Sequence, residues 1–236
     1  MTGANRGIGL AICENLIKNY PDVHVLLGSR DLKKGEAAAK SLNSDRVEAI
    51  ELDTSSDESV QKAYEQVKKS HSSLYGIVNN AGILESDPIV ALNTNYFGLR
   101  RVNDSFGKLL KRPGGRIVNI GSASGPMFVS SLRDKNLVTA FSQPWTIRGG
   151  VAELDEMANN WKGRGDGYGT SKAFVAAYTK LHAMEEPDLI INAVTPGFIA
   201  SDMGKSLGGK DLAFALSTVP YAATFSAIDK YSYWRA

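Results

Sequence analysis

Short apolar runs alternate with longer helical patterns along most of the chain, and this alternation constrains the fold more than any other feature. Five runs have the composition of strands, namely residues 24–28, 47–52, 74–78, 116–120 and 189–194. Their flanks carry Gly, Asn, Asp or Pro, which is typical of strand ends. Residues 8–18 and 99–110 repeat apolar side chains at helical spacing. The pattern predicts an α/β fold: a doubly wound parallel sheet with helices on both faces.

Composition narrows the class of protein. A length of 236 residues fits one domain, 1–236, and 43% hydrophobic with 22% charged residues excludes a disordered chain or a coiled coil. A net charge of +2 without a basic run predicts no nucleic-acid partner. No apolar run is long enough to cross a bilayer, and no signal peptide is evident. The single cysteine, Cys13, fits a reducing compartment, and the histidines lack metal-ligand spacing. We therefore expect a cytoplasmic protein without a metal site or a membrane span.

The chain opens at Met1 with no strand ahead of its glycine-rich loop. In a doubly wound sheet the first strand is central, and its absence would leave backbone groups in the core without partners. The strands predicted at 24–28 and 74–78 would then have no partner between them. We therefore expect the natural chain to carry several apolar residues ahead of Thr2.

The glycine-rich loop runs from Thr2 to Gly9, just before the first predicted helix, with glycines at positions 3, 7 and 9. Glycines let a backbone turn tightly and approach a pyrophosphate, which the N–H groups of a helix N-terminus then hold. The spacing Gly-x-x-x-Gly-x-Gly differs from the commoner Gly-x-Gly-x-x-Gly. By itself the loop indicates either a nucleotide site or a glycine-rich turn without a ligand.

Four further motifs follow, each at the end of a predicted strand or on a predicted helix: Asn79-Asn80-Ala81-Gly82, Asn95, Ser122 and Tyr168-x-x-x-Lys172. A lone Tyr-x-x-x-Lys carries little weight, because Tyr and Lys one helical turn apart often lie on a solvated face. All of these motifs occur in the order typical of the short-chain dehydrogenase/reductase family. The chain resembles this family from Thr2 to about Met203. The resemblance implies a Rossmann-type fold and a nicotinamide dinucleotide cofactor.

Ser122, Tyr168 and Lys172 have the chemistry that a reductase needs. Hydride addition to a carbonyl leaves a developing alkoxide, which requires a proton donor and a hydrogen-bond partner. We predict Tyr168 as general acid in reduction and general base in oxidation, with Ser122 bonded to the substrate oxygen. Lys172, one turn along the same helix face, is expected to lower the pKa of Tyr168. The resemblance implies that Lys172 also holds the nicotinamide ribose, and that Asn95 anchors a water linking Lys172 to solvent.

The choice between NAD and NADP is made at the end of the strand that follows the first helix, where an acidic residue accepts the adenosine 2′-hydroxyl of NAD. Arg30 replaces that acid, and Arg6 lies in the glycine loop. Two guanidinium groups suit a 2′-phosphate, and two solvated surface arginines are the alternative. Asp31 argues against binding of a 2′-phosphate, because its carboxylate would partly neutralise Arg30. We predict NADP(H), and the resemblance places Asp53 and Thr54 near the adenine.

The resemblance also assigns the Pro196-Gly197 segment to the nicotinamide, with Ile199 and Ser201 at the carboxamide. Phe198 falls where many carbonyl reductases have an aromatic wall of the substrate pocket, and a core aromatic is the alternative. The predicted cofactor site comprises Gly3, Asn5, Arg6, Gly7, Ile8, Gly9, Arg30, Asp53, Thr54, Asn80, Ala81, Gly82, Tyr168, Lys172, Pro196, Gly197, Ile199 and Ser201. The predicted substrate pocket comprises Ser122 and Phe198.

The segment 123–167, between Ser122 and Tyr168, is longer than in most relatives, and a connection of this length usually carries its own structure. Its residues 151–161 predict a helix with one apolar face. The insertion is similar to that of the monomeric carbonyl reductases and of the plant menthone and salutaridine reductases. We expect the helix to dock beside the active-site mouth, the segment to cover the helix of Tyr168, and the protein to be a monomer.

These features predict an NADPH-dependent carbonyl reductase that acts on a ketone, aldehyde or quinone. One alternative is an NADP-linked alcohol or hydroxysteroid-type dehydrogenase working in oxidation. The other is a catalytically silent NADP(H)-binding sensor, which the short interval 80–94 and the missing strand before Gly3 favour. The tail 210–236 is atypical of the family, with a final strand predicted at 231–234.

Overall fold

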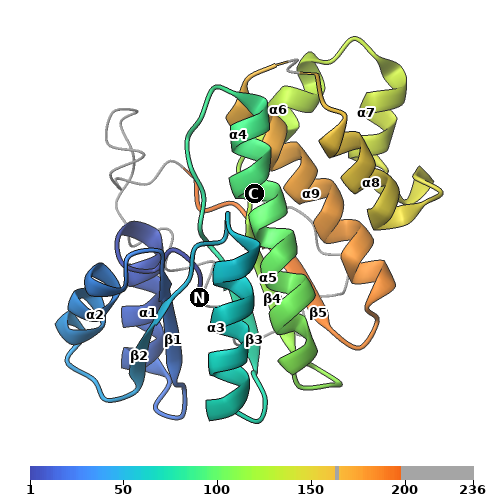
Figure 1. The fold of residues 1–236 in the computed structure, drawn as a ribbon. Coiled ribbons are helices and arrows are strands. Elements are labelled where there is room, and N and C mark those ends of the chain that lie inside the picture. Colours follow the sequence, from blue (N-terminus) through green and yellow to red (C-terminus); the bar gives the residue numbers. More distant parts are fainter. Residues whose placement is uncertain (163–164, 198–236) are drawn as a thin grey trace.

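The computed structural model describes residues 1–162 and 165–197. Parallel strands form the centre of this part of the chain (Figure 1). They are β1 (Val25–Ser29), β2 (Val47–Glu51), β3 (Gly76–Asn79), β4 (Arg116–Ile120) and β5 (Ile190–Val194). β1 pairs with β2, and β4 lies between β3 and β5. All five predicted strands are confirmed, with no end displaced by more than two residues. The strand predicted at 231–234 lies outside the described residues.

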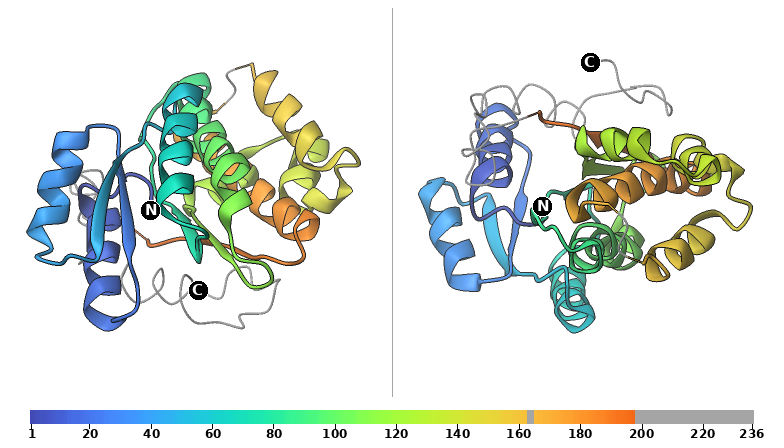
Figure 2. Two further views of the ribbon diagram at one scale, coloured as in Figure 1. Left: turned by 60° about the horizontal axis from the view of Figure 1, so that its bottom comes forward. Right: turned by 90° about the horizontal axis from the view of Figure 1, so that it is seen from above.

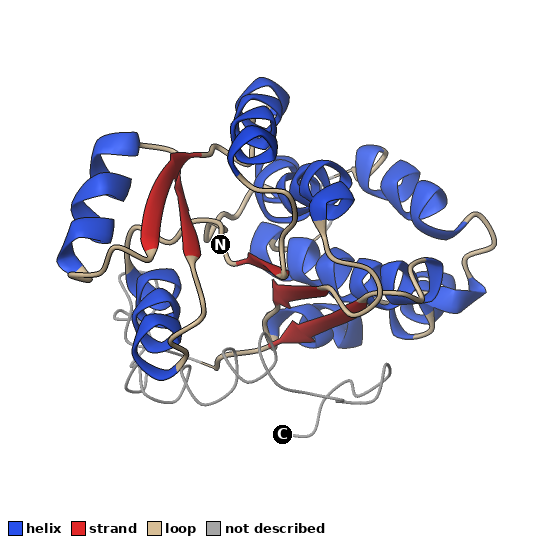
Figure 3. Ribbon diagram, turned by 90° about the horizontal axis from the view of Figure 1, so that it is seen from below, coloured by secondary structure: helices blue, strands red, loops and turns tan. Residues whose placement is uncertain are grey.

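Residues 1–4 lie between the two groups of strands and connect them (Figure 3). The amide of Thr2 donates to the carbonyl of Val78 in β3 over 3.0 Å. The carbonyl of Met1 accepts from the amide of Gly28 in β1 over 2.8 Å. This segment therefore occupies the central place, where a doubly wound sheet has its first strand. The expectation of apolar residues ahead of Thr2 stays a prediction.

Helices cover the strands and fill the connections between them. They are α1 (Gly7–Asn19), α2 (Leu32–Ser41), α3 (Asp57–Ser70), α4 (Pro88–Ala91), α5 (Gly98–Phe106), α6 (Ser124–Ser131), α7 (Lys135–Ser142), α8 (Gly150–Asn159) and α9 (Gly167–Glu185). A π-helical turn, Leu92–Phe97, joins α4 to α5. The predicted helix 99–110 is confirmed in its first part, but it tightens after Phe106 into a single 3₁₀ turn. No helix among the described residues is long and apolar enough to cross a membrane.

Alternating side chains of the strands face two separate cores. Val78 and Val118 pack with α1 and α2, whereas Ile77 and Ile117 pack with α3 and α5. Neighbouring residues of a strand point to opposite faces, so these two pairs of helices cover opposite faces of the sheet (Figure 2). Asn119, on the same face as Ile117, forms a hydrogen bond with α9. The doubly wound arrangement is thus confirmed.

The predicted insertion folds into α6, α7 and α8, which pack on α9 (Figure 1). The amide of Val151 in α8 donates to the carboxylate of Glu185, the last residue of α9, over 3.1 Å. Asp155 of α8 makes an ion pair of 3.1 Å with Arg100 of α5. α8 is therefore held at the C-terminal end of α9, away from Tyr168 at its N-terminal end. The prediction that α8 docks beside the active-site mouth is wrong, because its partners lie at the other end of the helix.

An aromatic cluster joins the insertion to α9. α8 ends at Asn159, so Trp161 lies beyond the helix that was predicted to contain it. Its ring packs edge-on against Phe174 of α9, with the centroids 5.4 Å apart. Phe128 of α6 and Phe141 of α7 pack against the same tryptophan. The insertion therefore covers α9 with its own apolar side chains.

Candidate active site

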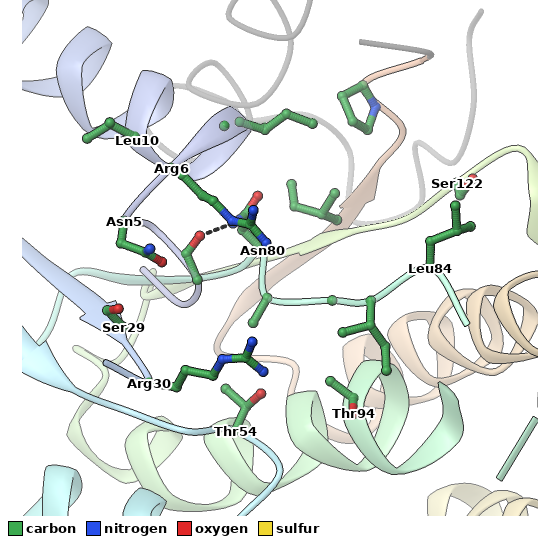
Figure 4. A pocket seen from close by; sticks show the side chains of 18 of the residues that line it. Asn5, Arg6, Leu10, Ser29, Arg30, Thr54, Asn80, Leu84, Thr94 and Ser122 are labelled. Carbon is green, nitrogen blue, oxygen red and sulfur yellow. Dashed lines mark hydrogen bonds between the residues drawn. The ribbon is translucent and has the colours of Figure 1, made fainter. Parts of the chain in front are cut away.

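A cleft of about 1140 Å³ opens at the carboxyl ends of the strands (Figure 4). Its walls are the loop 5–8 and the segments that follow each strand, namely 29–31, 52–55, 80–84, 120–124 and 195–197. Tyr168 and Lys172 of α9 also line the cleft. Ligands of doubly wound α/β proteins bind at this edge of the sheet. The cleft is large enough for a dinucleotide together with a small substrate.

The glycine loop runs so close to the segment after β3 that side chains are excluded. Gly3 has φ +60° and Gly7 has φ +56°, in the left-handed region that favours glycine. A Cβ on Gly3 would lie 2.8 Å from the Cα of Ala81, and one on Gly9 would lie 2.6 Å from Nδ2 of Asn80. α1 begins at Gly7 without a side-chain cap. Its first N–H groups and its dipole therefore favour an anion, as a dinucleotide pyrophosphate requires.

Thr2 and Asn80 fix this loop to the end of β3. Oγ1 of Thr2 accepts from the backbone amides of Asn80 and Ala81 at 3.0 and 2.9 Å. The side-chain amide of Asn80 donates to the carbonyls of Thr2 and Gly3 at 3.0 and 2.9 Å. The sequence predicts Asn80 and Ala81 as site residues but misses Thr2, whose place directly before Gly3 is its only signal. Thr2 therefore shapes the loop without lining the cleft.

Basic side chains line the end of the cleft next to α2. Arg6 and Arg30 are both exposed there, and Arg30 extends from the end of β1 toward Thr54 (Figure 4). Lys34 of α2 lines the same end, and its place in the sequence gives no signal of this. Asp31 accepts from the amide of Lys34 at 3.1 Å and pairs with its Nζ at 3.6 Å. Asp31 thus caps α2 and pairs with Lys34, and its partial neutralisation of Arg30 stays a prediction.

Asp53 and Thr54 follow β2 and line the same part of the cleft. Oδ1 of Asp53 accepts from the amide and the hydroxyl of Ser55 at 2.9 and 2.7 Å. These hydrogen bonds lower the pKa of Asp53, and the nearby charges of Arg30 and Arg101 lower it further. The Asp53 carboxylate is therefore ionised, and the Arg30 guanidinium lies close enough to interact with its charge.

Tyr168 and Lys172 project from the first turns of α9, which Asp166 caps by accepting from the amide of Gly169 at 2.8 Å. Lys172 is only 5% exposed, and its Nζ donates to the carbonyl of Ile120 at the end of β4 over 2.7 Å. The same Nζ lies 5.6 Å from the centre of the Tyr168 ring. The two side chains therefore meet at the end of β4, beside the segment that carries Ser122.

Burial shifts the pKa values of both Tyr168 and Lys172. It raises the pKa of Tyr168, although a hydrogen bond with Ser122 acts in the opposite direction, and it lowers the pKa of Lys172 to about 8. The net pKa of Tyr168 is therefore raised rather than lowered as predicted, because burial outweighs the effects that favour the phenolate. The ammonium is directed at the Ile120 carbonyl, while the phenol has lost hydration. Tyr168 keeps its proton at neutral pH, which is the form that a general acid needs.

Ser122 and Asn95 occupy different places at this end of the cleft. Ser122 lines it, and its Oγ accepts from the amide of Ser124 at 3.2 Å. Asn95 lies in the π-helical turn behind the wall and is 2% exposed. Its Oδ1 accepts from the amide of Ile83 at 2.8 Å, and its Nδ2 donates to the carbonyl of Ile83 at 3.0 Å. Asn95 therefore supports the wall of the cleft from behind.

The structure brings nearly all of the predicted site residues together. Of those that it describes, Gly9 and Asn95 do not line the cleft, since each packs behind a segment that does. Pro196 and Gly197 line it as predicted. The predicted positions Phe198, Ile199 and Ser201 lie outside the described residues.

Known proteins share this architecture. Salutaridine reductase from Papaver somniferum superposes with a TM-score of 0.83 at 23% identity, over 95% of this chain and 94% of the other. Menthone neomenthol reductase from Mentha piperita gives a TM-score of 0.68 at 24% identity, over 95% and 93% of the two chains. At this level of identity the two superpositions establish the fold alone.

Curated relatives match over almost their whole length. Carbonyl reductase (NADPH) 3 of Rattus norvegicus is 28% identical over 249 residues, which are 94% of this chain and 89% of the relative. The (+)-neomenthol dehydrogenase of Arabidopsis thaliana is 29% identical over 252 residues, 88% of this chain and 84% of the relative. The family model described as short chain dehydrogenase matches residues 1–132. Since this match spans more than half of the chain, the protein belongs to the short-chain dehydrogenase family.

Proposed function

We propose that the protein is an NADPH-dependent carbonyl reductase that converts a ketone, aldehyde or quinone into an alcohol. The observation that carries the proposal is the distribution of side chains along one cleft, with Arg6 and Arg30 at one end and Ser122, Tyr168 and Lys172 at the other. The relatives named carbonyl reductase (NADPH) support the same cofactor and reaction. Cys13 is buried and forms no disulfide, which is consistent with a protein that functions in the reducing cytoplasm.

The cofactor would lie along the cleft from the basic end to Tyr168. The loop at Gly3 and Gly7 and the N-terminus of α1 hold the pyrophosphate. Arg6, Arg30 and Lys34 bind the 2′-phosphate through charged hydrogen bonds, which are stronger than neutral ones. When bound, NADPH supplies the hydride.

The protein's own side chains supply the proton that the substrate oxygen takes up. Tyr168 donates its phenolic proton to the carbonyl oxygen as that oxygen gains negative charge, and Ser122 donates a hydrogen bond to the same atom. Lys172, protonated below its pKa of about 8, stabilises the phenolate that remains and binds the nicotinamide ribose. Asn95 holds the wall beside Lys172 and anchors the water that returns a proton from solvent.

Steady-state oxidation of NADPH with a panel of quinones, aldehydes and ketones tests the proposal. A carbonyl reductase oxidises NADPH with at least one class of these substrates. Turnover only with alcohols and NADP would instead identify a dehydrogenase working in oxidation. NADPH binding without turnover of any substrate would identify a catalytically silent sensor and overturn the proposal.

Cofactor preference depends on Arg30. The Arg30→Asp variant replaces a cation facing the 2′-phosphate by a carboxylate suited to a 2′-hydroxyl. We expect NADPH affinity to fall at least about tenfold, since a charged hydrogen bond contributes about 1.5–3 kcal/mol, and preference to move toward NADH. Fluorescence titration of both cofactors measures the change. Lys33→Asp, an equal charge change at an exposed α2 residue that does not line the cleft, is the matched control. Equal affinity of the unmutated protein for NADH and NADPH would contradict the assignment.

We propose a monomer, because the insertion occupies the outer side of α9. Phe141 and Trp161 pack there against Phe174, and Phe128 packs against both of them. An apolar helix face that is already covered offers no patch to drive association. Light scattering at micromolar concentration should give a mass near 25.4 kDa. A dimer or tetramer mass would contradict this prediction.

A further inference from the structure

Ser171 lies between Tyr168 and Lys172 on α9 and is completely buried. A serine inside a helix often satisfies its hydroxyl on its own helix, and Ser171 donates to the carbonyl of Tyr168 over 2.8 Å. Its oxygen also accepts a hydrogen bond of 2.9 Å from Nδ2 of Asn95, which belongs to another element. The hydroxyl thus joins α9 to the π-helical turn.

Asn95 extends this link to the wall of the cleft. The same side chain pairs with the amide and the carbonyl of Ile83, at 2.8 and 3.0 Å. The wall is tight here, because a Cβ on Gly82 would lie 3.1 Å from Oδ1 of Asn95 and 3.8 Å from Nζ of Lys172. Lys172 therefore lies against a wall that Asn95 positions, and Asn95 is itself held by Ser171.

The hydrogen bond between Asn95 and Ser171 matters because of the backbone conformation around Asn95. A π-helical turn is a rare conformation that occurs often at functional sites, and it needs support from its surroundings to persist. In the turn Leu92–Phe97, Asn95 and Tyr96 are buried, and the Asn95 side chain is one of the groups that tie the turn to α9. Removing the Ser171 hydroxyl would leave one N–H of Asn95 buried without an acceptor.

We infer that Ser171 is a positioning residue for the pair Tyr168 and Lys172, a role that rests on the proposed reductase function. Its hydroxyl fixes the spacing between α9 and the wall at Gly82–Ile83, and so the place of both side chains relative to the substrate oxygen. A small displacement at a proton-transfer site reduces the rate far more than it reduces stability.

Thr179 provides a matched control on the same helix. It is 1% exposed, donates to the carbonyl of Val175 over 2.7 Å and accepts from Nδ2 of Asn119 over 2.9 Å. It lies about two turns beyond Lys172 and does not line the cleft. Ser171→Ala and Thr179→Val therefore remove the same two kinds of hydrogen bond, one pair beside the site and one pair away from it.

Amide hydrogen exchange tests the link without any turnover. The amide of Ile83 donates to Oδ1 of Asn95, so its exchange rate reports how firmly Asn95 is held. After correction for global stability, we expect Ser171→Ala to speed this exchange about tenfold and Thr179→Val to leave it unchanged. Unchanged exchange of Ile83 in Ser171→Ala would overturn the inference, whether or not the protein reduces carbonyls.

Kinetics with NADPH and a carbonyl substrate test the consequence. We expect kcat of Ser171→Ala to fall roughly tenfold with little change in KM for NADPH, while kcat of Thr179→Val stays within about twofold of the unmutated protein. The double variant with Asn95→Ala should be no slower than Asn95→Ala alone, since both changes break one link. Equal losses of kcat in Ser171→Ala and Thr179→Val would show a merely structural hydroxyl and overturn the inference.

An unmutated protein that is inactive on every carbonyl would instead refute the proposed function. The exchange measurement would still decide whether Ser171 holds Asn95.

Discussion

The Tyr168→Phe variant is expected to lose about 1000-fold in kcat while still binding NADPH. A positioned general acid contributes on the order of 100- to 10000-fold, and the phenol is the proton donor that we assign. Burial raises the pKa of Tyr168, so the unmutated side chain carries its proton at neutral pH. Phenylalanine keeps the ring that lies beside Lys172 and removes only the acidic group. Steady-state kinetics and a fluorescence titration of NADPH measure the two effects separately.

Tyr75→Phe is the control for this substitution. Tyr75 is 54% exposed, and its hydroxyl accepts from Nε of Arg116 at the opposite, amino end of β4. The same chemical change there should leave kcat unaltered. Near wild-type kcat in Tyr168→Phe would remove Tyr168 from the mechanism.

The Lys172→Met variant is expected to be more stable than the unmutated protein at pH 7 and at least about 100-fold less active. Burial lowers the pKa of Lys172 from its ordinary 10.5 to about 8, so the folded protein holds an ammonium in a poorly hydrated place. A pKa difference of this size corresponds to about 3 kcal/mol. Loss of the hydrogen bond to the Ile120 carbonyl costs about 1 kcal/mol in return. The free energy of unfolding should therefore rise by about 2 kcal/mol.

The same lysine gives stability a characteristic pH dependence. Between pH 8 and 10.5 the unfolded chain keeps the Lys172 proton and the folded protein has released it. The unfolded state thus binds more protons, and the free energy of unfolding rises with pH across this window. Urea unfolding at several pH values should show this rise in the unmutated protein and its loss in Lys172→Met. Lys62→Met, at an exposed position of α3, should keep it. Parallel curves for Lys172→Met and the unmutated protein would contradict a buried ammonium.

The sequence by itself determines the sheet and most of the cleft. Buried parallel strands need apolar residues, so β1, β3, β4 and β5 are visible as short, mostly apolar runs, whereas the half-exposed β2 alternates apolar residues with glutamate. In a parallel sheet the carboxyl ends of all strands meet at one edge. Residues that follow the strands, such as Arg30, Asn80 and Ser122, are therefore brought together by topology before any side-chain contact is known.

The tertiary structure alone decides how the side chains in that cleft behave. The pKa of Tyr168 rises because burial removes water from its hydroxyl, an effect that no spacing of Tyr and Lys encodes. The place of α8 follows from its apolar packing on α9 and from the ion pair between Asp155 and Arg100, residues far apart in the chain. The bond from Asn95 to Ser171 likewise joins elements that meet only after folding. Local periodicity specifies which residues form each element, whereas hydration, charge pairing and long-range hydrogen bonds depend on distances that exist only in the packed molecule.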